Sequence, residues 1–189
     1  KKRIISILVF VLSIFSVVAQ QFSAETLLSD IAERKISPVR MPSYVSMNDG
    51  EYYTTLSSDG KQIVKYAYKT GVQVGIILDV TKTKNLTLEK IEGYAFSADE
   101  TRILVYNNVE KRYRHSFSAD YYVYDTKRNR LELLSENGKQ KEAVFSPDGR
   151  MVAFSRNNNL FIKKLDFGTE VAVTVDGETD KIVNGTPDW

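Results

Sequence analysis

A tight turn leads directly into an apolar strand in the stretch Ser146-Pro-Asp-Gly-Arg-Met-Val-Ala-Phe154. Asp can hydrogen-bond its own backbone and Gly accepts a positive φ, so the Asp-Gly pair favours a hairpin turn. Two similar segments come earlier in the chain. Ser57-Ser-Asp-Gly-Lys61 precedes the predicted strand Ile63–Ala67, and Ser97-Ala-Asp-Glu100 precedes the apolar run Ile103–Tyr106. The chain is therefore expected to repeat a strand–turn–strand unit.

The spacing of these turns predicts the architecture. Their aspartates, Asp59, Asp99 and Asp148, are 40 and 49 residues apart, and a period of about 40 to 50 residues is typical of a four-stranded β-propeller blade. Further runs are predicted to be strands: Tyr52–Leu56, Val72–Leu78, Gly93–Phe96, Tyr121–Asp125, Leu131–Leu134, Ala143–Phe145 and Leu160–Leu165. We predict an all-β fold in which residues 44–189 form about three to four blades of an incomplete β-propeller, truncated at its C-terminus, because propellers close with at least four blades. The alternative is a meander or sandwich whose turns coincide by chance.

The N-terminus has the three parts of a secretory signal peptide. Residues 1–3 form a basic head, residues 4–18 are apolar apart from three serines, and Ala19 is a small residue before a polar stretch. The apolar core is shorter than the roughly 20 residues that span a bilayer. We expect residues 1–19 to be cleaved and the protein to be exported, either to the periplasm or secreted. The alternative is an uncleaved signal anchor that tethers the protein to the membrane.

Residues 20–43 are expected to form a short helix and a linker. Ala24, Leu27, Leu28 and Ile31 recur at three- and four-residue spacing after Ser23, a candidate N-cap, and this is the pattern of an amphipathic helix. Two prolines, at positions 38 and 42, then end the helical pattern.

Composition excludes several classes of site. Lys plus Arg number 26 and Asp plus Glu 24, a net charge of +2, which is too balanced for a protein that binds a phosphate backbone. Because the chain has no cysteine and one histidine, His115, thiolate and multi-histidine metal sites are ruled out. We expect no metal, no cofactor and no nucleic-acid partner. The repeated aspartates lack the spacing of calcium ligands and are expected to be turn formers.

A longer stretch, Arg102–Asp125, carries a family resemblance. It contains Tyr113-Arg-His-Ser116 between two strands, and its second strand ends in Tyr-Asp. This stretch is similar to the dipeptidyl peptidase IV branch of the prolyl oligopeptidase family. The Asn157-Asn-Asn-Leu-Phe-Ile162 turn and strand resemble the next blade of that family, and Gly177–Trp189 resembles the run before its glutamate motif. The resemblance covers about residues 26–189.

The resemblance implies a serine exopeptidase in which an eight-bladed propeller caps an α/β-hydrolase domain. Such an enzyme releases Xaa-Pro or Xaa-Ala dipeptides from peptide N-termini, so its partners are peptides with Pro or Ala second, and the full-length enzyme is a homodimer. The hydrolase domain, the Ser-Asp-His triad and the paired glutamates are expected beyond Trp189. No Gly-x-Ser-x-Gly motif occurs in the chain, so we expect this portion alone to lack catalytic residues.

One substrate-binding site of the family falls within the chain. The resemblance places Arg114 against the backbone carbonyl of the substrate, and a guanidinium, with several fixed donors and a permanent charge, suits that role. His115 is expected either to contact the substrate or to support the loop. We predict that Asn107–Ala119 is a long excursion between strands that reaches the site. The alternative is a solvated loop in which Arg114 pairs with a surface carboxylate.

Two other functions stay open at this point. The first is a non-enzymatic periplasmic propeller that binds proteins or glycans through its loops, as TolB-like modules do. The second is a tripeptide-releasing relative with the same architecture.

Overall fold

The computed structural model describes residues 24–36, 42–114 and 116–187, in two compact units, Lys1–Met41 and Pro42–Trp189. The expected signal peptide and the N-cap Ser23 lie outside the described residues. In the first unit, helix α2 (Ala24–Ala32) lies where the sequence predicts a helix, and none of its residues is buried. No helix of the described part is long and apolar enough to cross a membrane.

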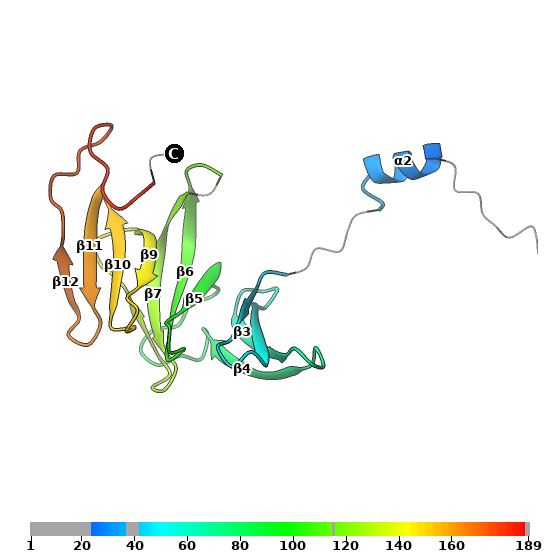
Figure 1. The fold of residues 1–189 in the computed structure, drawn as a ribbon, viewed down its shortest axis with the longest axis horizontal. Helices are drawn as coiled ribbons and strands as arrows, with labels where there is room; N and C mark the ends of the chain where they lie inside the picture. The colour runs from blue at the N-terminus through cyan, green and yellow to red at the C-terminus, as the bar shows by residue number, and fades with distance from the viewer. Residues whose placement is uncertain (1–23, 37–41, 115, 188–189) are drawn as a thin grey trace, which may run out of the picture. The chain divides into compact units, whose positions relative to one another are not determined.

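The second unit contains three four-stranded antiparallel sheets (Figure 1), in which each strand pairs with its neighbours in sequence. The first sheet consists of β1 (Tyr44–Ser46), β2 (Tyr52–Leu56), β3 (Gln62–Ala67) and β4 (Gln73–Asp79). The second consists of β5 (Gly93–Phe96), β6 (Arg102–Lys111), β7 (Phe117–Asp125) and β8 (Arg130–Leu133). The third consists of β9 (Lys141–Phe145), β10 (Met151–Arg156), β11 (Asn159–Lys164) and β12 (Thr169–Ala172). The predicted all-β fold of four-stranded blades is confirmed.

The three turns do not all occupy the same place in their sheets, so the repeat has a different phase from the one expected. The turns Ser97–Glu100 and Ser146–Gly149 join the first and second strands of their sheets, but Ser57–Gly60 joins the second and third strands of the first sheet. The turn in the equivalent position is Met47–Gly50, between β1 and β2. The 40-residue spacing from Asp59 to Asp99 is therefore not a blade period.

The Met47–Gly50 turn has the same backbone hydrogen bonds as the turns at Ser97 and Ser146, and it occupies the same place in its sheet. The Gly50 N–H donates to the Met47 carbonyl, as Glu100 donates to Ser97 and Gly149 to Ser146. Asp49 Oδ1 accepts from the amides of Glu51 and Tyr52, as Asp99 and Asp148 accept from the amides two residues on. The in-phase aspartates are thus Asp49, Asp99 and Asp148, which are 50 and 49 residues apart. The sequence pattern hides the first turn because Met47 stands where the other turns have Ser.

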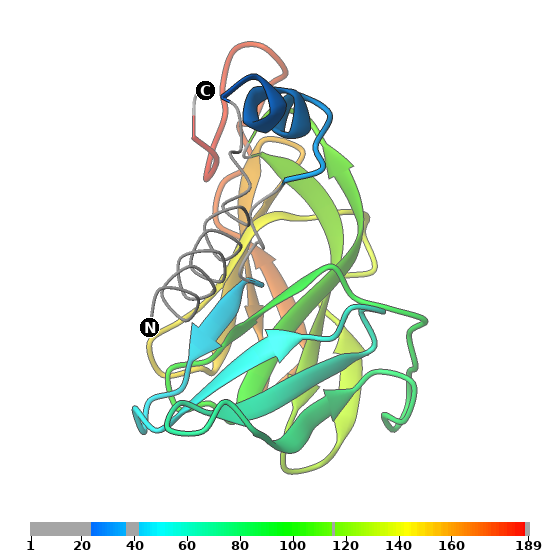
Figure 2. The same ribbon diagram turned by 90° about the vertical axis from the view of Figure 1, so that its right-hand side faces the viewer.

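The second sheet is buried on both faces. Ile103 and Val105 of β6 are fully buried in a cluster with Ile63 and Leu78 of the first sheet. Leu104, between them, points to the opposite face and packs in a second cluster that includes Phe154 of the third sheet. Figure 2 shows the first sheet, cyan to teal, lying over the green strands of the second. An apolar face on each side of one sheet therefore joins the three sheets.

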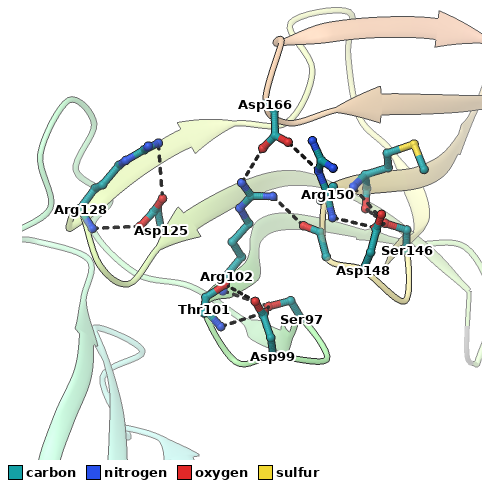
Figure 3. A network of polar contacts seen from close by, with 12 residues as sticks. Ser97, Asp99, Thr101, Arg102, Asp125, Arg128, Ser146, Asp148, Arg150 and Asp166 are labelled. Carbon is teal, nitrogen blue, oxygen red and sulfur yellow. Dashed lines mark hydrogen bonds and ion pairs between the residues drawn. The ribbon is translucent and has the colours of Figure 1, made fainter.

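Polar contacts join the sheets at the end where the in-phase turns lie (Figure 3). The Arg102 guanidinium donates to the Gly149 carbonyl at 2.7 Å and pairs with Asp166 Oδ1 at 2.8 Å. Arg150 Nε lies 2.8 Å from the other oxygen of the same carboxylate. On the other side, the Asn48 amide donates to the Glu100 carboxylate. Each in-phase turn thus contacts the turn of the neighbouring sheet.

The turn aspartates accept several hydrogen bonds. Asp99 accepts from the Ser97 hydroxyl at 2.7 Å and from the Thr101 hydroxyl at 2.8 Å, and these bonds lower the pKa of Asp99 to about 2. The hydroxyls of Ser57 and Ser146, with backbone N–H groups, lower the pKa of Asp59 and Asp148 in the same way. These contacts confirm the prediction that the aspartates form the turns.

We predict that the stability of the protein depends on pH through these carboxylates. A carboxyl group with a depressed folded pKa stabilises the fold above its unfolded pKa of about 3.9 and loses that contribution as pH falls through the folded value. Thermal melting of the full-length protein should therefore give a melting temperature that falls between about pH 4 and pH 2. Asp99→Asn should lower the melting temperature at pH 7 and flatten this dependence.

Asp180→Asn is the matched control, because the Asp180 side chain makes no hydrogen bond or ion pair with the described residues. Equal pH profiles for Asp99→Asn and the unmodified protein would show that the turn does not stabilise the fold through its ionised carboxylate.

Candidate functional site

The β6–β7 hairpin extends past the strands on either side of it (Figure 1). Strand β5 pairs with β6 only along Ile103–Tyr106, and β8 pairs with β7 only along Tyr122–Asp125. Beyond these residues, the two strands continue as a ribbon in which Glu110 pairs with Ser118 and Lys111 with Phe117. The prediction of a long excursion over Asn107–Ala119 is therefore wrong. Most of that segment is strand.

A β-bulge explains the difference. The register shifts between Asn107 and Glu110, and Asn108 has a φ of 51°. Asn adopts this left-handed conformation more readily than most residues do, and the Asn108 side-chain amide also donates to Asp120 at 2.8 Å. The extra residue of the bulge interrupts the alternation of apolar and polar side chains. Without that alternation, the polar stretch is typical of a loop.

The turn at the tip of the hairpin presents Arg114. The Arg112 N–H donates to the Ser116 carbonyl at 3.0 Å and closes the turn, and the Arg112 guanidinium lies 5.8 Å from the centre of the Tyr113 ring. Tyr113 is 67% exposed. Arg114 is exposed too, and it makes no hydrogen bond or ion pair with any described residue. The surface ion pair that the alternative interpretation requires is thus not formed with the residues described. His115 lies outside them, so its role stays a prediction.

The base of the ribbon is packed against the sheets. The Tyr106 ring contacts the rings of Phe117 and Tyr121, with centroids 5.2 and 5.3 Å away. Tyr121 is 5% exposed, and burial raises the pKa of its phenol. Ala119 is fully buried and exchanges two backbone hydrogen bonds with Gln140. The tip is therefore exposed while the segment that carries it is anchored in the core.

The run before the expected glutamate motif folds onto the third sheet. Asn157 and Asn158 both have positive φ, 48° and 59°, and form the two-residue turn between β10 and β11 that such a pair favours. The Asn184 N–H donates to the Asn158 carbonyl at 2.9 Å, and Thr186 contacts the Ser155 hydroxyl at 2.7 Å.

This run lies at the same end of the sheets as the Arg114 turn. The β6–β7 and β10–β11 turns both join the second and third strands of in-phase sheets, and both lie at the top of Figure 1. Two of the sequence segments that carry the resemblance are thus brought to one end of the domain. In the part of the chain that the structure describes, no group of three His, Cys, Asp or Glu side chains could hold a metal ion.

Comparison with known proteins matches this arrangement to one family. The family model for the dipeptidyl peptidase IV N-terminal region matches residues 97–189. The crystal structure of Porphyromonas gingivalis dipeptidyl peptidase 4 is similar over 85% of this chain, with 40% sequence identity and a TM-score of 0.77. The chain belongs to the dipeptidyl peptidase IV family and is its N-terminal propeller portion. The resemblance found in the sequence is confirmed.

Two fungal relatives show how much of the family the chain covers. A probable dipeptidyl peptidase 4 of Emericella nidulans is 33% identical over 83% of this chain and 20% of its own length. A probable dipeptidyl-aminopeptidase B of the same organism is 38% identical over 49% of this chain and 10% of its own length. The chain also covers 23% of the Porphyromonas gingivalis structure. It therefore spans at most about a quarter of each of these three proteins.

Sequence reasoning missed the residues that anchor the β6–β7 hairpin. Lys139 and Gln140 lie between β8 and β9 in a polar segment that is typical of an ordinary connection. Gln140 is fully buried, and its side-chain oxygen accepts from the Tyr121 N–H at 3.1 Å. No local pattern marks this contact, because its partners are 19 residues apart.

We predict that Gln140→Ala destabilises the full-length protein by about 1–3 kcal/mol, because the buried Tyr121 N–H loses its acceptor. Chemical denaturation measures the change. Gln73→Ala on the exposed side of β4 is the control and should change the free energy of unfolding by less than about 0.5 kcal/mol. Equal effects of the two substitutions would contradict an anchoring role for Gln140.

Proposed function

We propose that the protein to which this chain belongs is a serine-type dipeptidyl peptidase that releases Xaa-Pro or Xaa-Ala dipeptides from peptide N-termini. The observation that carries the proposal is Arg114, which is exposed, has no hydrogen-bond or ion-pair partner among the described residues, and lies at the tip of a hairpin whose base is anchored in the core. The names of the relatives support the dipeptidyl specificity. The triad and the hydrolase domain are assigned to sequence beyond residue 189, and the homodimer is assigned to the full-length enzyme.

In this proposal, Arg114 binds the substrate and does not take part in bond cleavage. Its guanidinium has five N–H donors and stays charged at any physiological pH. These donors suit the carbonyl oxygen of a bound peptide, because the exposed side chain is not held by any residue in the described part of the chain. Held in this way, the peptide would keep its scissile bond in one position relative to the triad. His115 is proposed to orient the turn beside Arg114 or to contact the peptide.

The proposal predicts that Arg114→Ala lowers kcat/KM for an Ala-Pro or Gly-Pro substrate by about ten- to a thousandfold, or about 1.4 to 4 kcal/mol, the range for a charged hydrogen bond that positions the substrate. Arg114→Lys should recover part of the loss, because an ammonium lacks the planar fork. The measurement is steady-state kinetics of the full-length protein with thermal melts of each variant.

Arg112→Ala, in the same turn, is the control and should behave like the unmodified protein. Equal losses of kcat/KM for the Arg112 and Arg114 variants, or a loss that follows a lower melting temperature, would refute the binding of the substrate carbonyl by Arg114. A protein that releases tripeptides from Ala-Ala-Pro substrates but no dipeptides would favour the tripeptidyl relative. A protein with no peptidase activity would favour a binding propeller.

We also propose that the protein is exported, with residues 1–19 removed as a signal peptide. N-terminal sequencing of the protein isolated from its own cells should give a mature start at or near Gln20. Recovery of the basic head, residues 1–3, would instead support an anchored form.

A further inference from the structure

Two adjacent residues hold the two arms of the β6–β7 ribbon. On the β7 arm, Gln140 pairs with the backbone of Ala119, with N···O distances of 3.0 and 2.9 Å. On the β6 arm, the Lys139 ammonium donates to the Asn108 carbonyl and lies 2.7 Å from the Glu110 carboxylate. The connection between β8 and β9 thus contacts both arms within two residues.

The β6 arm needs this contact. A two-stranded ribbon is at best marginally stable by itself, and the bulge takes the Asn108 carbonyl out of the regular ladder of backbone bonds. Asn108 is exposed, so without Lys139 its carbonyl would bond to water and would no longer join the bulge to the connection between β8 and β9. Lys139 is well suited to supply the donor, because its ammonium has three N–H groups and its side chain is 26% exposed. One cation therefore satisfies the bulge and neutralises Glu110.

The bulge also lies close to the tip. Glu110 is the last residue but one of β6, four positions before Arg114, and the turn of Arg112–Ser116 follows directly. A change in the direction of the β6 arm would therefore move the whole turn. Where binding depends on geometry, a displacement of about 1 Å can cost about a hundredfold in rate.

We propose that Lys139 is a positioning residue. Through its hydrogen bond to Asn108 and its ion pair with Glu110, it fixes the direction of the hairpin and thereby the position of Arg114. The consequence for catalysis rests on the proposed function of Arg114. The effect of the two Lys139 contacts on the hairpin is a property of the fold and can be measured separately.

Hydrogen exchange of the full-length protein tests whether Lys139 stabilises the β6–β7 ribbon. Lys139→Ala should raise the exchange rates of amides in residues 107–114 by about tenfold or more, because the local opening of the ribbon becomes easier. The rates in β2, β3 and β10 should stay unchanged. Lys141→Ala is the matched control, because Lys141 lies two residues on and forms no ion pair with the described residues. Unchanged exchange in the ribbon of Lys139→Ala would overturn the proposal.

A double-mutant cycle tests the action through Arg114. Lys139→Ala should lower kcat/KM about three- to thirtyfold in the unmodified enzyme, mainly through a higher KM, and should have almost no further effect in the Arg114→Ala enzyme. Lys139→Arg, which keeps the charge and donors, should restore most of the activity. Equal losses in the two backgrounds would show that Lys139 acts independently of Arg114.

The outcomes separate the two proposals. If Arg114→Ala leaves the kinetics unchanged, the proposed substrate binding by Arg114 is wrong, and the positioning role of Lys139 in catalysis is wrong with it. If Arg114→Ala loses activity while Lys139→Ala behaves like Lys141→Ala, substrate binding by Arg114 is supported and the positioning role of Lys139 is overturned. Faster exchange confined to the ribbon, together with an effect of Lys139→Ala that disappears without Arg114, supports both.

Discussion

The structure depends on the burial of one sheet on both of its faces. Successive side chains of a strand point to opposite sides, so the run Ile103-Leu104-Val105, with exposures of 0%, 1% and 0%, needs an apolar surface on each side. The first sheet covers one face and the third sheet covers the other. This mutual burial places the sheets side by side and makes the fold a stack of blades, in which each sheet is stabilised chiefly by its neighbours.

The contacts between the turns and the proposed binding residue lie at different ends of this stack. The in-phase turns with Asp49, Asp99 and Asp148 meet at one end. There the Arg102–Asp166 ion pair links the second and third sheets, and Arg150 of the third sheet pairs with the same carboxylate. The β6–β7 tip and the Gly177–Pro187 run lie at the other end. Arg114, the proposed binding residue, can therefore lie on an extended hairpin without weakening the contacts that hold the sheets together. Its ribbon depends instead on Lys139, Gln140 and the aromatic contacts at its base.

Several features were predictable because they depend on a few consecutive residues. The Asp turns, the Asn157-Asn158 turn and ten of the strands follow from local hydrogen bonding, positive φ and apolar patterns. The short edge strands β1 and β12 were missed, since a strand of three or four residues leaves little pattern. The predicted phase of the repeat was wrong because the turn between β1 and β2 begins with Met47, where the other turns have a serine. The length of the loop before Arg114 was wrong because a bulge at Asn108 hides the continuation of β6.

The sequence by itself determined the all-β repeat, the family resemblance and the position of Arg114 between two strands, since each of these depends on residues that are close along the chain. The tertiary structure alone decided which turns are in phase, how far the hairpin extends and what holds it. Lys139 meets Glu110 across 29 residues, and Arg102 meets Asp166 across 64. Such pairs depend on the packing and register of separate sheets, which bring long side chains to one place. No short-range rule encodes that geometry.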